Sequence, residues 1–172
     1  MAKRPQQPRG RKPAQPALPA PRIRSATAAD ARAVRDLLLE LGYRASLRDA
    51  GRRLRALLAT GSDPVFLAMA GEAAVGLMAL HRTAMLQYRE PVTRITTLVV
   101  SERARGTGVG RLLVEHAARL AKRWGCGVLE LTTGLARQDA QAFYRATGFD
   151  ATAVRFVQPL SPRMKRRLDY RA

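Results

Sequence analysis

Two stripes of apolar residues recur at helical spacing in the first third of the chain. They comprise Val34, Leu37, Leu38 and Leu41 in the first stripe, and Leu54, Leu57 and Leu58 in the second. This spacing puts the apolar side chains on one face of a helix. Thr27 and Ser46 precede the stripes, each with an aspartate three residues on, which is typical of helix starts. We therefore predict two amphipathic helices after a short strand near Ile23, with Gly42 ending the first helix.

The apolar pattern changes after residue 64. Short apolar runs between polar turns predict strands at residues 65–70, 74–80, 95–100 and 128–133. Helical spacing returns from Val109 to about Trp124, and again from Ala140 to Thr147. The first three of these strands form an antiparallel meander, whereas a helix separates the third from the fourth, so that these two can lie parallel. We predict an α/β (α+β) fold: a mixed, mostly antiparallel twisted sheet with helices on both faces.

Charge and proline content set the two ends of the chain apart. The 172 residues carry a formal net charge of +18, and the first 24 hold seven lysines or arginines and no acid. Because residues 1–21 also hold most of the ten prolines, we expect a disordered basic arm there, a folded domain at 22–160 and a basic tail at 161–172. These ends could make weak contacts with nucleic acid or another acidic surface, or simply be solvated.

Several classes of protein are excluded. The basic arm is not a secretory signal, because no apolar run follows its charges, and no stretch approaches the roughly 20 apolar residues of a membrane span. Cys126 is the single cysteine, which rules out an internal disulfide or a cysteine metal cluster and fits a reducing cytoplasm. With two histidines in the chain, we expect no metal site. The oligomeric state is left open, with a homodimer among the options.

The most informative stretch is LVVSERARGTGVGRLL, residues 98–113, where a strand runs through a glycine-rich turn into a helix. Bare backbone at Gly106, Gly108 and Gly110 lets several N–H groups face one anion at the helix start, where the helix dipole favours a phosphate. Nearby arginines can add bidentate contacts to phosphate oxygens. A P-loop would end in Gly-Lys-Ser/Thr, and a dinucleotide fingerprint would space its glycines differently, so both fit poorly.

Two motifs resemble the GNAT N-acetyltransferase family. The turn Arg105-Gly106-Thr107-Gly108-Val109-Gly110 resembles that family's acetyl-CoA signature, Arg/Gln-x-x-Gly-x-Gly/Ala, and residues 142–149 (AFYRATGF) look like its Phe-Tyr-x-x-x-Gly-Phe element. The predicted element order, which ends in a strand after the last helix, is also that of the family's fold. The resemblance covers roughly residues 22–158. It implies acetyl transfer from acetyl-CoA directly to a primary amine.

The resemblance also assigns roles to residues. It implies that backbone groups of Leu98, Val99 and Val100 pair with the pantetheine arm of acetyl-CoA, that the turn from Arg105 to Gly110 together with Arg111 holds the pyrophosphate, and that Tyr144 protonates the leaving sulfur. Some relatives carry a glutamate on the strand before the turn, where this chain has Thr96 and Thr97. Glu130 on the next strand is therefore the expected proton acceptor. His81 is a weaker candidate, more often structural.

Arg137 marks a departure from the broader family, in which many relatives have an asparagine seven residues before the tyrosine. Arg137-x-Asp139-Ala140-x-x-Phe143-Tyr144 is similar to a branch that includes aminoalkylphosphonate acetyltransferases, although Gln141 stands where that branch often has histidine. We expect Arg137 to contact the cofactor. Acceptor pockets of this fold are built largely from the first two helices, their loop and the segment 83–93.

Three functions stay open at this point. The preferred one is acetylation of a small, anionic amine, for which the many arginines are suited. The second is acetylation of a protein or peptide, and the third is a nucleic-acid- or ribosome-associated module that binds acetyl-CoA. Fold alone does not choose among them.

Overall fold

A computed structural model describes residues 18–162 and 164 of the chain. The backbone forms two compact units, with the boundary between Leu129 and Glu130. The basic arm predicted at residues 1–21 falls mainly outside the described residues, as does most of the tail predicted at 161–172. Among the residues described, no helix is both long enough and apolar enough to cross a membrane.

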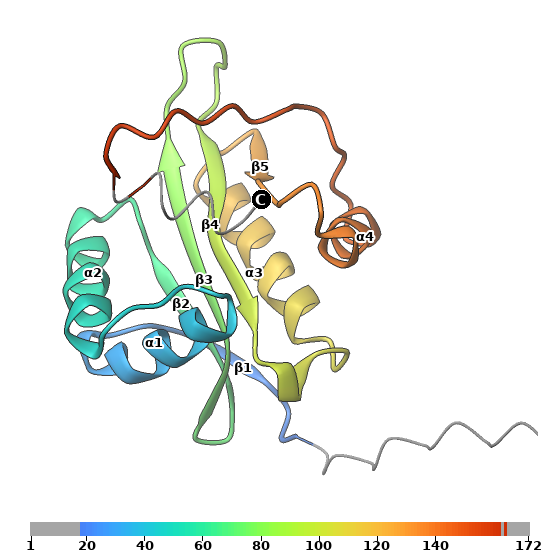
Figure 1. Ribbon diagram of the computed structural model, residues 1–172. Coiled ribbons are helices and arrows are strands. Elements are labelled where there is room, and N and C mark those ends of the chain that lie inside the picture. Colours follow the sequence, from blue (N-terminus) through green and yellow to red (C-terminus); the bar gives the residue numbers. More distant parts are fainter. Residues whose placement is uncertain (1–17, 163, 165–172) are drawn as a thin grey trace, which may run out of the picture. The chain divides into compact units, whose positions relative to one another are not determined.

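The first unit is built around an antiparallel sheet (Figure 1). The elements in chain order are β1 (Arg22–Ser25), η1 (Ala28–Asp30), α1 (Ala31–Glu40), α2 (Leu47–Thr60), β2 (Val65–Ala70), β3 (Ala73–Thr83), β4 (Val92–Val100), η2 (Glu102–Ala104) and α3 (Val109–Arg123). β5 (Val128–Leu131) begins in this unit, and the strand order of the sheet is β1-β2-β3-β4-β5. The predicted mixed sheet with helices on both faces is confirmed.

Side-chain hydrogen bonds set the starts of the first helices where the sequence predicts them. The backbone N–H of Thr27 donates to Asp30 Oδ2 at 2.7 Å, and the Asp49 N–H donates to Ser46 Oγ at 3.1 Å. These bonds satisfy backbone donors that have no partner inside the helix. Just beyond the ends of α1 and α2 lie Gly42 and Gly61, whose positive φ angles of 89° and 70° favour glycine.

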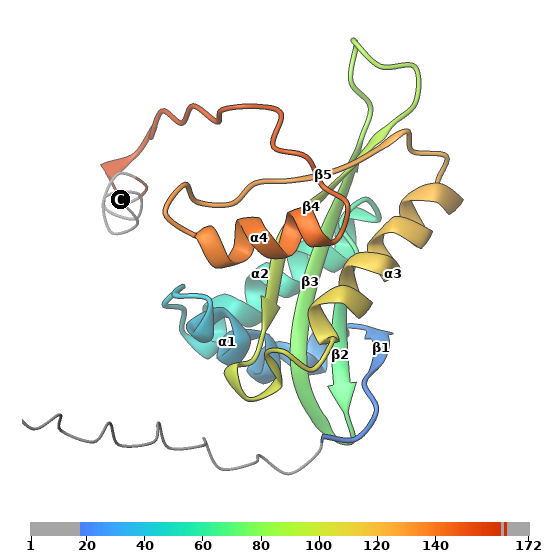
Figure 2. The ribbon, with the colours of Figure 1, turned by 90° about the vertical axis from the view of Figure 1, so that its right-hand side faces the viewer.

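Alternation along the strands divides the core between two faces of the sheet. Val65, Leu67 and Leu77 point to one face and form a cluster with side chains of α1 and α2, which include Val34, Leu37 and Leu54. On the other face Phe66 stacks edge-on against His116 of α3, with ring centroids 4.7 Å apart. Figures 1 and 2 show α3 on the opposite side of the sheet from α1 and α2.

Gly76 of β3 lets α3 pack closely on the sheet. A Cβ atom at this position would lie 3.0 Å from Leu113 Cδ1 and 3.1 Å from Val109 Cγ1. Both partners are almost fully buried, at 0% and 1% exposure. Since Val109 is the first residue of α3, this contact fixes the place where the helix begins relative to β3 and β4.

Two sequence predictions are wrong in detail. Leu57 and Leu58 are 36% and 37% exposed, because the centre of α2, rather than its last turn, packs inward through Ala50, Gly51 and Leu54. At Gly51, where α2 packs on α1, an added Cβ would meet Ala31 Cβ at an ordinary contact distance of 3.4 Å.

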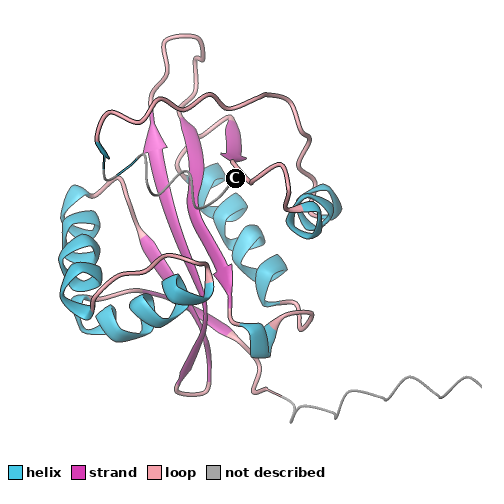
Figure 3. Cartoon of the chain, in the orientation of Figure 1, coloured by secondary structure: helices cyan, strands magenta, loops and turns pink. Residues whose placement is uncertain are grey.

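The strand expected after the last helix is also missing. The second unit contains the end of β5 and α4 (Gln138–Ala146), and residues 151–160 that follow are irregular (Figure 3). Phe156 and Leu160 in this segment are about nine-tenths exposed, at 92% and 89%. An apolar run becomes a strand only where a neighbouring strand accepts its backbone hydrogen bonds, and this segment has β-like residues without that pairing in the described structure.

Candidate functional site

The glycine-rich turn joins the end of β4 to the start of α3. Gly106 and Gly108 have φ angles of 78° and 88°, in the left-handed region that glycine tolerates. A Cβ built on either residue meets no atom within 4 Å, so the space above the turn is open. The glycines therefore serve backbone conformation and access for a ligand, rather than packing.

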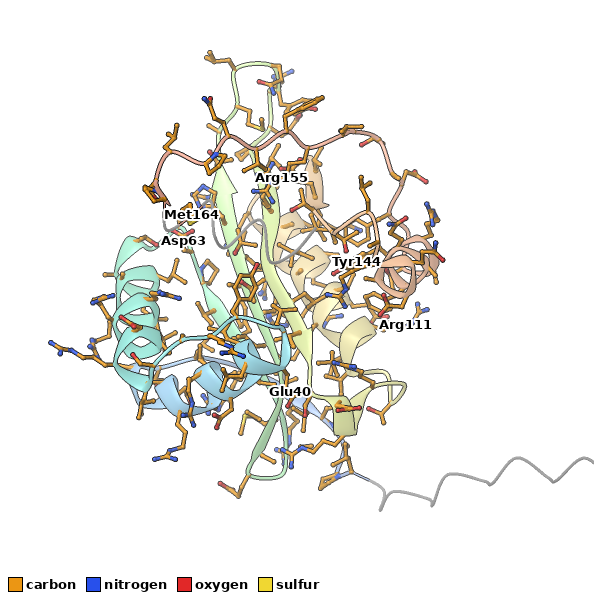
Figure 4. The ribbon with its side chains drawn as sticks, in the orientation of Figure 1. Glu40, Asp63, Arg111, Tyr144, Arg155 and Met164 are labelled. Carbon is orange, nitrogen blue, oxygen red and sulfur yellow. The ribbon has the colours of Figure 1, made fainter. Side chains whose placement is uncertain are left out.

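The start of α3 presents backbone donors to this open space. The first bond of the helical pattern runs from the Leu112 N–H to the Gly108 carbonyl at 3.0 Å, so the N–H groups of Val109 and Gly110 precede it. Donors in a first helical turn lack intrahelical acceptors, and the helix dipole adds positive potential there. Arg103, Arg105 and Arg111 are exposed around the same turn, and Figure 4 labels Arg111 at the first turn of α3. The arrangement suits a phosphate or pyrophosphate group.

Contacts from both sides hold the turn in place. Glu40, the last residue of α1, accepts a hydrogen bond from Ser101 Oγ at 2.9 Å and another from the Glu102 N–H at 2.7 Å. Ser101 is 5% exposed, and Ala104 is 1% exposed. On the far side, Thr107 Oγ1 donates to the Ala104 carbonyl at 2.7 Å. The turn is thus a braced loop, and Figure 4 shows Glu40 between α1 and η2.

β4 extends well past the point that β5 can reach. The chain enters β5 beside the start of β4, where the Gly127 N–H donates to the Pro91 carbonyl at 3.1 Å. β5 has four residues and β4 has nine. Because β5 begins beside the start of β4, its four residues end before they reach Leu98. Backbone groups at Leu98, Val99 and Val100 on that edge can therefore pair with an extended ligand as with an added strand. Arg105 Nε also donates to the Val100 carbonyl, at 3.4 Å.

In the second unit, Tyr144 lies on α4 (Figure 4). Its ring makes edge-to-face contacts with Phe143 and Phe149, with centroids 5.3 and 5.8 Å away. Burial raises the pKa of the Tyr144 phenol, while the positive charge of Arg137 acts to lower it and the negative charge of Asp139 to raise it. The phenol is therefore protonated at neutral pH and above.

The other predicted residues of this unit are more exposed. Arg137 stands at the N-cap of α4, and its guanidinium lies 3.8 Å from the Asp139 carboxylate, in a pair too exposed to hold either side chain strongly. Glu130 is half-buried on β5. Gln141 donates to the carbonyls of Gly134 and Leu135, at 3.2 and 2.8 Å, and so braces the loop before the helix.

The structure shows a partner for His81 that sequence reasoning missed. His81 Nδ1 lies 2.7 Å from Asp63 Oδ1, and Ser62 Oγ donates to the other carboxylate oxygen at 2.9 Å. Burial acts to raise the pKa of Asp63, but hydrogen bonds from Thr60, Ser62 and His81 outweigh it and hold the pKa below its usual value. Asp63 is 18 residues from His81 in sequence, so no local motif links the pair. Glu40 was missed for the same reason.

His116, the other histidine, lies in a different setting on α3. Its Nε2 atom is buried and has no hydrogen-bond partner among the described residues. Burial lowers the pKa of this imidazole, and the charges of Arg119 and Arg123 act in the same direction. No group of three His, Cys, Asp or Glu side chains within residues 18–162 is arranged to hold a metal ion.

Comparison with known proteins identifies similar sequences and structures. The model of the acetyltransferase (GNAT) family matches residues 31–149. The chain is 28% identical to the aminoalkylphosphonate N-acetyltransferase of Salmonella typhimurium over 155 residues, which are 83% of this chain and 94% of that protein. It is 33% identical to the aminoglycoside N(6')-acetyltransferase type 1 of Stenotrophomonas maltophilia over 149 residues, 83% and 96% of the two chains.

Solved structures agree at the level of the fold. A transcriptional regulator from Bacillus halodurans C-125 superposes with a TM-score of 0.77 and 27% identity, over 82% of this chain and 100% of that one. An aminoglycoside N-acetyltransferase in complex with CoA superposes with a TM-score of 0.74 and 20% identity, over 86% and 100%. The two matches carry different descriptions, so the fold by itself does not select a substrate.

Proposed function

The chain belongs to the GNAT acetyltransferase family and is an N-acetyltransferase, and from this premise we propose that it transfers acetyl from acetyl-CoA to the primary amine of a small molecule. Acetyl-CoA is the acetyl donor of the family, and its thioester carbon is the electrophile that the amine attacks. The single observation that carries the proposal is the turn at Gly106–Gly108, with open space above it and unpaired first-turn donors behind it.

The proposed cofactor site uses residues of the first unit, and the family resemblance adds Arg137, on the second unit, as a further candidate for contact with the cofactor. Gly106, Thr107, Gly108, Val109 and Gly110 would surround the pyrophosphate with backbone groups, and Arg105 and Arg111 would add charge. The edge of β4 at Leu98, Val99 and Val100 would pair with the extended pantetheine arm. Support for this fit comes from the Cβ-free space at the two glycines, which a side chain would fill.

Tyr144 is proposed to donate a proton to the sulfur that leaves. A thiolate is a poor leaving group compared with a thiol, so a proton supplied as the C–S bond breaks lowers the barrier. The raised pKa of the phenol supports this role, because the donor form is then the populated form across the neutral and mildly alkaline range.

Glu130 is proposed to accept the proton that the amine nitrogen releases as its bond to the acetyl carbon forms. Its half-buried position on β5 is compatible with a carboxylate that meets a polar ligand on one side. A Glu130→Gln variant keeps the shape of the side chain and removes its basicity. We expect turnover to fall while acetyl-CoA binding is unchanged.

For the acceptor, we propose a small anionic amine of the aminoalkylphosphonate type. The relative from Salmonella typhimurium is named for such a substrate and aligns over 83% of this chain. The excess of arginines in the chain, within a net charge of +18, suits a phosphonate or carboxylate group. An aminoglycoside acceptor, suggested by the relative from Stenotrophomonas maltophilia, is the comparison that a substrate screen must include.

The cofactor site is tested by calorimetric titration of acetyl-CoA into a Gly108→Glu variant. A carboxylate at this position repels phosphate, and we expect the affinity to fall by roughly tenfold or more, or about 1.4 kcal/mol. Gly125→Glu is the matched control, because Gly125 has a positive φ of 68° and equally open surroundings at the other end of α3. Equal affinity in the two variants would sink the assignment of the pyrophosphate site.

The acceptor is tested with the full-length chain, by thiol release from acetyl-CoA in the presence of 2-aminoethylphosphonate or tobramycin. Preferential turnover of 2-aminoethylphosphonate supports the proposed substrate class. Preferential turnover of tobramycin would replace it with the aminoglycoside class, and turnover of neither amine would contradict a small-molecule acceptor of these two kinds.

A further inference from the structure

The His81–Asp63 pair lies on the face of the sheet that carries α1 and α2. Leu77 and Ala79 of β3 point into the core cluster on that face, and the alternation of the strand places His81 on the same side. Asp63 comes from the loop between α2 and β2 (Figure 4). In this fold the acceptor is expected to bind beside α1, α2 and the segment 83–93, and His81 lies two residues before that segment.

The surroundings of the pair fix its geometry. Backbone N–H groups of Leu80 and Arg82 donate to the carbonyls of Pro64 and Ser62, at 3.0 and 3.1 Å, so the Asp63 backbone runs directly beside His81. The side chain of Asp63 is 16% exposed, whereas that of His81 is 41% exposed. An ionised carboxylate only accepts hydrogen bonds, so in the neutral ring Nδ1 carries the hydrogen and Nε2 has the free lone pair. The ring is thus partly exposed and offers a proton acceptor at Nε2.

Register places His81 near the proposed position of the thioester. His81 pairs with Arg94 of β4, and a bulge on β4 follows, since Leu80 pairs with Ile95 while Ala79 pairs with Thr97. If the pyrophosphate lies at Gly106–Gly110, a pantetheine arm along β4 runs from Val100 back towards this bulge. Bulges interrupt strand pairing and often lie next to active sites. The charged groups that register and hydrogen bonding put beside His81 are Arg94 and Asp63.

We propose that His81 is a second proton acceptor of the acetyl transfer, which converts the bound acceptor from ammonium to free amine, and that Asp63 is its positioning residue. This deepens the proposed function and rests on it. An ammonium nitrogen carries three protons, and the amide nitrogen formed from it keeps one. The first proton passes to His81 Nε2 and then to solvent. The second leaves as the C–N bond forms, is accepted by Glu130, and is balanced by the proton that Tyr144 gives to sulfur.

His81 and Asp63 have different roles in this proposal, whereas the two members of a purely structural ion pair would not. Besides its contact with His81, Asp63 accepts a hydrogen bond from Ser62 Oγ, and its backbone N–H donates to Thr60 Oγ1 at 3.1 Å, so its position does not depend on His81 alone. A half-exposed imidazole next to a fixed carboxylate keeps one tautomer and one ring orientation, which is what a general base requires. If the pair were only structural, its loss would reduce activity by the same factor at every pH and with every acceptor. The pH dependence of the loss therefore distinguishes the two roles.

The test compares the full-length wild type with His81→Gln in acetyl transfer to 2-aminoethylphosphonate, or to tobramycin if that amine is turned over instead. Near pH 7 the amine is mostly ammonium, and we expect kcat/KM of the variant to fall by about 100-fold. As the pH rises towards the pKa of the amine, solvent supplies the free amine and the defect should shrink to less than about tenfold. A defect of the same size at every pH would overturn the proposal.

Chemical rescue gives a second readout that a structural role would not move. Added imidazole should restore part of the activity of His81→Ala and should not change the activity of His116→Gln, the matched control on α3, which we expect to be as active as wild type. Asp63→Asn should show an intermediate loss, whereas Asp36→Asn, an exposed aspartate of α1 paired with Arg35, should show none. Absence of rescue together with full activity of Asp63→Asn would also overturn the proposal.

Different experimental results would contradict this inference and the proposed function. A wild-type chain that binds acetyl-CoA yet acetylates neither amine contradicts the proposed acceptors and with them the reaction that His81 would serve. An active wild type beside an equally active His81→Gln contradicts only the role of His81. Calorimetric titration with acetyl-CoA, which His81 is not expected to touch, verifies that each variant is folded.

Discussion

Individual carboxylates in this protein join segments that are distant in sequence or mark where a helix begins. Glu40 links the end of α1 to the loop that starts at Ser101, about 60 residues later, by two hydrogen bonds. Asp30 binds the Thr27 backbone at 2.7 Å and the Arg24 guanidinium at 2.6 Å. Since the carboxylate form accepts these bonds and the acid form accepts them poorly, such residues make local structure depend on pH.

Asp30 provides a test of that dependence. Its pKa is lowered to about 2, chiefly by the Arg24 hydrogen bond and against the effect of burial, with help from Thr27. A carboxylate whose pKa is lower in the folded state stabilises the fold above its unfolded pKa of 3.8 and loses that effect as the pH falls towards 2. Asp30→Asn should reduce the free energy of unfolding by about 1 kcal/mol at pH 7. Thermal unfolding at pH 7 and pH 2.5 measures it, and an equal difference at both values would contradict this account.

Tyr144→Phe removes the phenol and leaves the ring contacts with Phe143 and Phe149. We expect kcat to fall by about 100-fold, a typical contribution of general acid catalysis, with little change in the KM for acetyl-CoA. Because burial raises the pKa of the phenol, the acid form persists as the pH rises, and wild-type kcat should not decline until the pH exceeds the ordinary tyrosine pKa of 10.0. Steady-state kinetics from pH 6 upward would reveal an earlier decline, which would count against Tyr144 as the acid.

At the scale of elements, α3 connects core packing to the turn that is proposed to bind the cofactor. Its first residue, Val109, is buried against β3, while the residue before it, Gly108, forms part of the open turn. The helix therefore cannot move away from the sheet without moving the turn. The small size of Gly76 sets the distance between β3 and α3, since the nearest side-chain atoms leave no room for a methyl group.

Gly76→Ala tests this coupling between core and turn. The new methyl group would lie within 3.0–3.2 Å of Leu113, Val109 and Ala68, and such overpacking costs about 1–3 kcal/mol. We expect a lower Tm and also a weaker affinity for acetyl-CoA, measured by calorimetry well below the Tm. Gly51→Ala in α2 is the control, because its methyl group would meet Ala31 at an ordinary 3.4 Å on the other face of the sheet. Similar acetyl-CoA affinities for the two variants would argue against the coupling.

At the scale of the whole molecule, the net charge of +18 creates a long-range field that attracts anions. Such a field raises the local concentration of an anionic substrate and repels a cationic one. Salt screens it, since the Debye length is about 10 Å at 0.1 M ionic strength. Acetyl-CoA itself is anionic, so the field acts on both the donor and the proposed acceptor.

This field predicts a substrate-dependent salt effect. At saturating acetyl-CoA, kcat/KM for 2-aminoethylphosphonate should fall several-fold as NaCl rises from about 0.05 M to about 0.5 M, because screening removes the attraction. For the cationic tobramycin the same change should leave kcat/KM constant or raise it. Initial rates over this range provide the measurement. A parallel decline for both amines would show that salt acts on something other than long-range attraction.

Much of this architecture could be predicted from short-range patterns. Interactions between residues a few positions apart determine where the first helices begin, at Thr27 and Ser46, and where the glycine turn before α3 lies. The prediction failed where distant partners decide the outcome. Leu57 and Leu58 are at helical spacing but lie beyond the part of α2 that packs inward, and the residues expected to form a last strand have no paired neighbour among the described elements.

The sequence by itself determined the family and the order of the elements as far as the last helix, and it predicted the residues of the proposed phosphate-binding turn, because these are encoded in contiguous motifs and periodicities. The tertiary structure alone decided that Glu40 braces this turn, that Gly76 sets the position of α3, and that Asp63 holds His81. The physical reason is that hydrogen bonds and packing contacts form between groups that folding brings together. Separations of 18 to 61 residues leave no local trace of them in the chain.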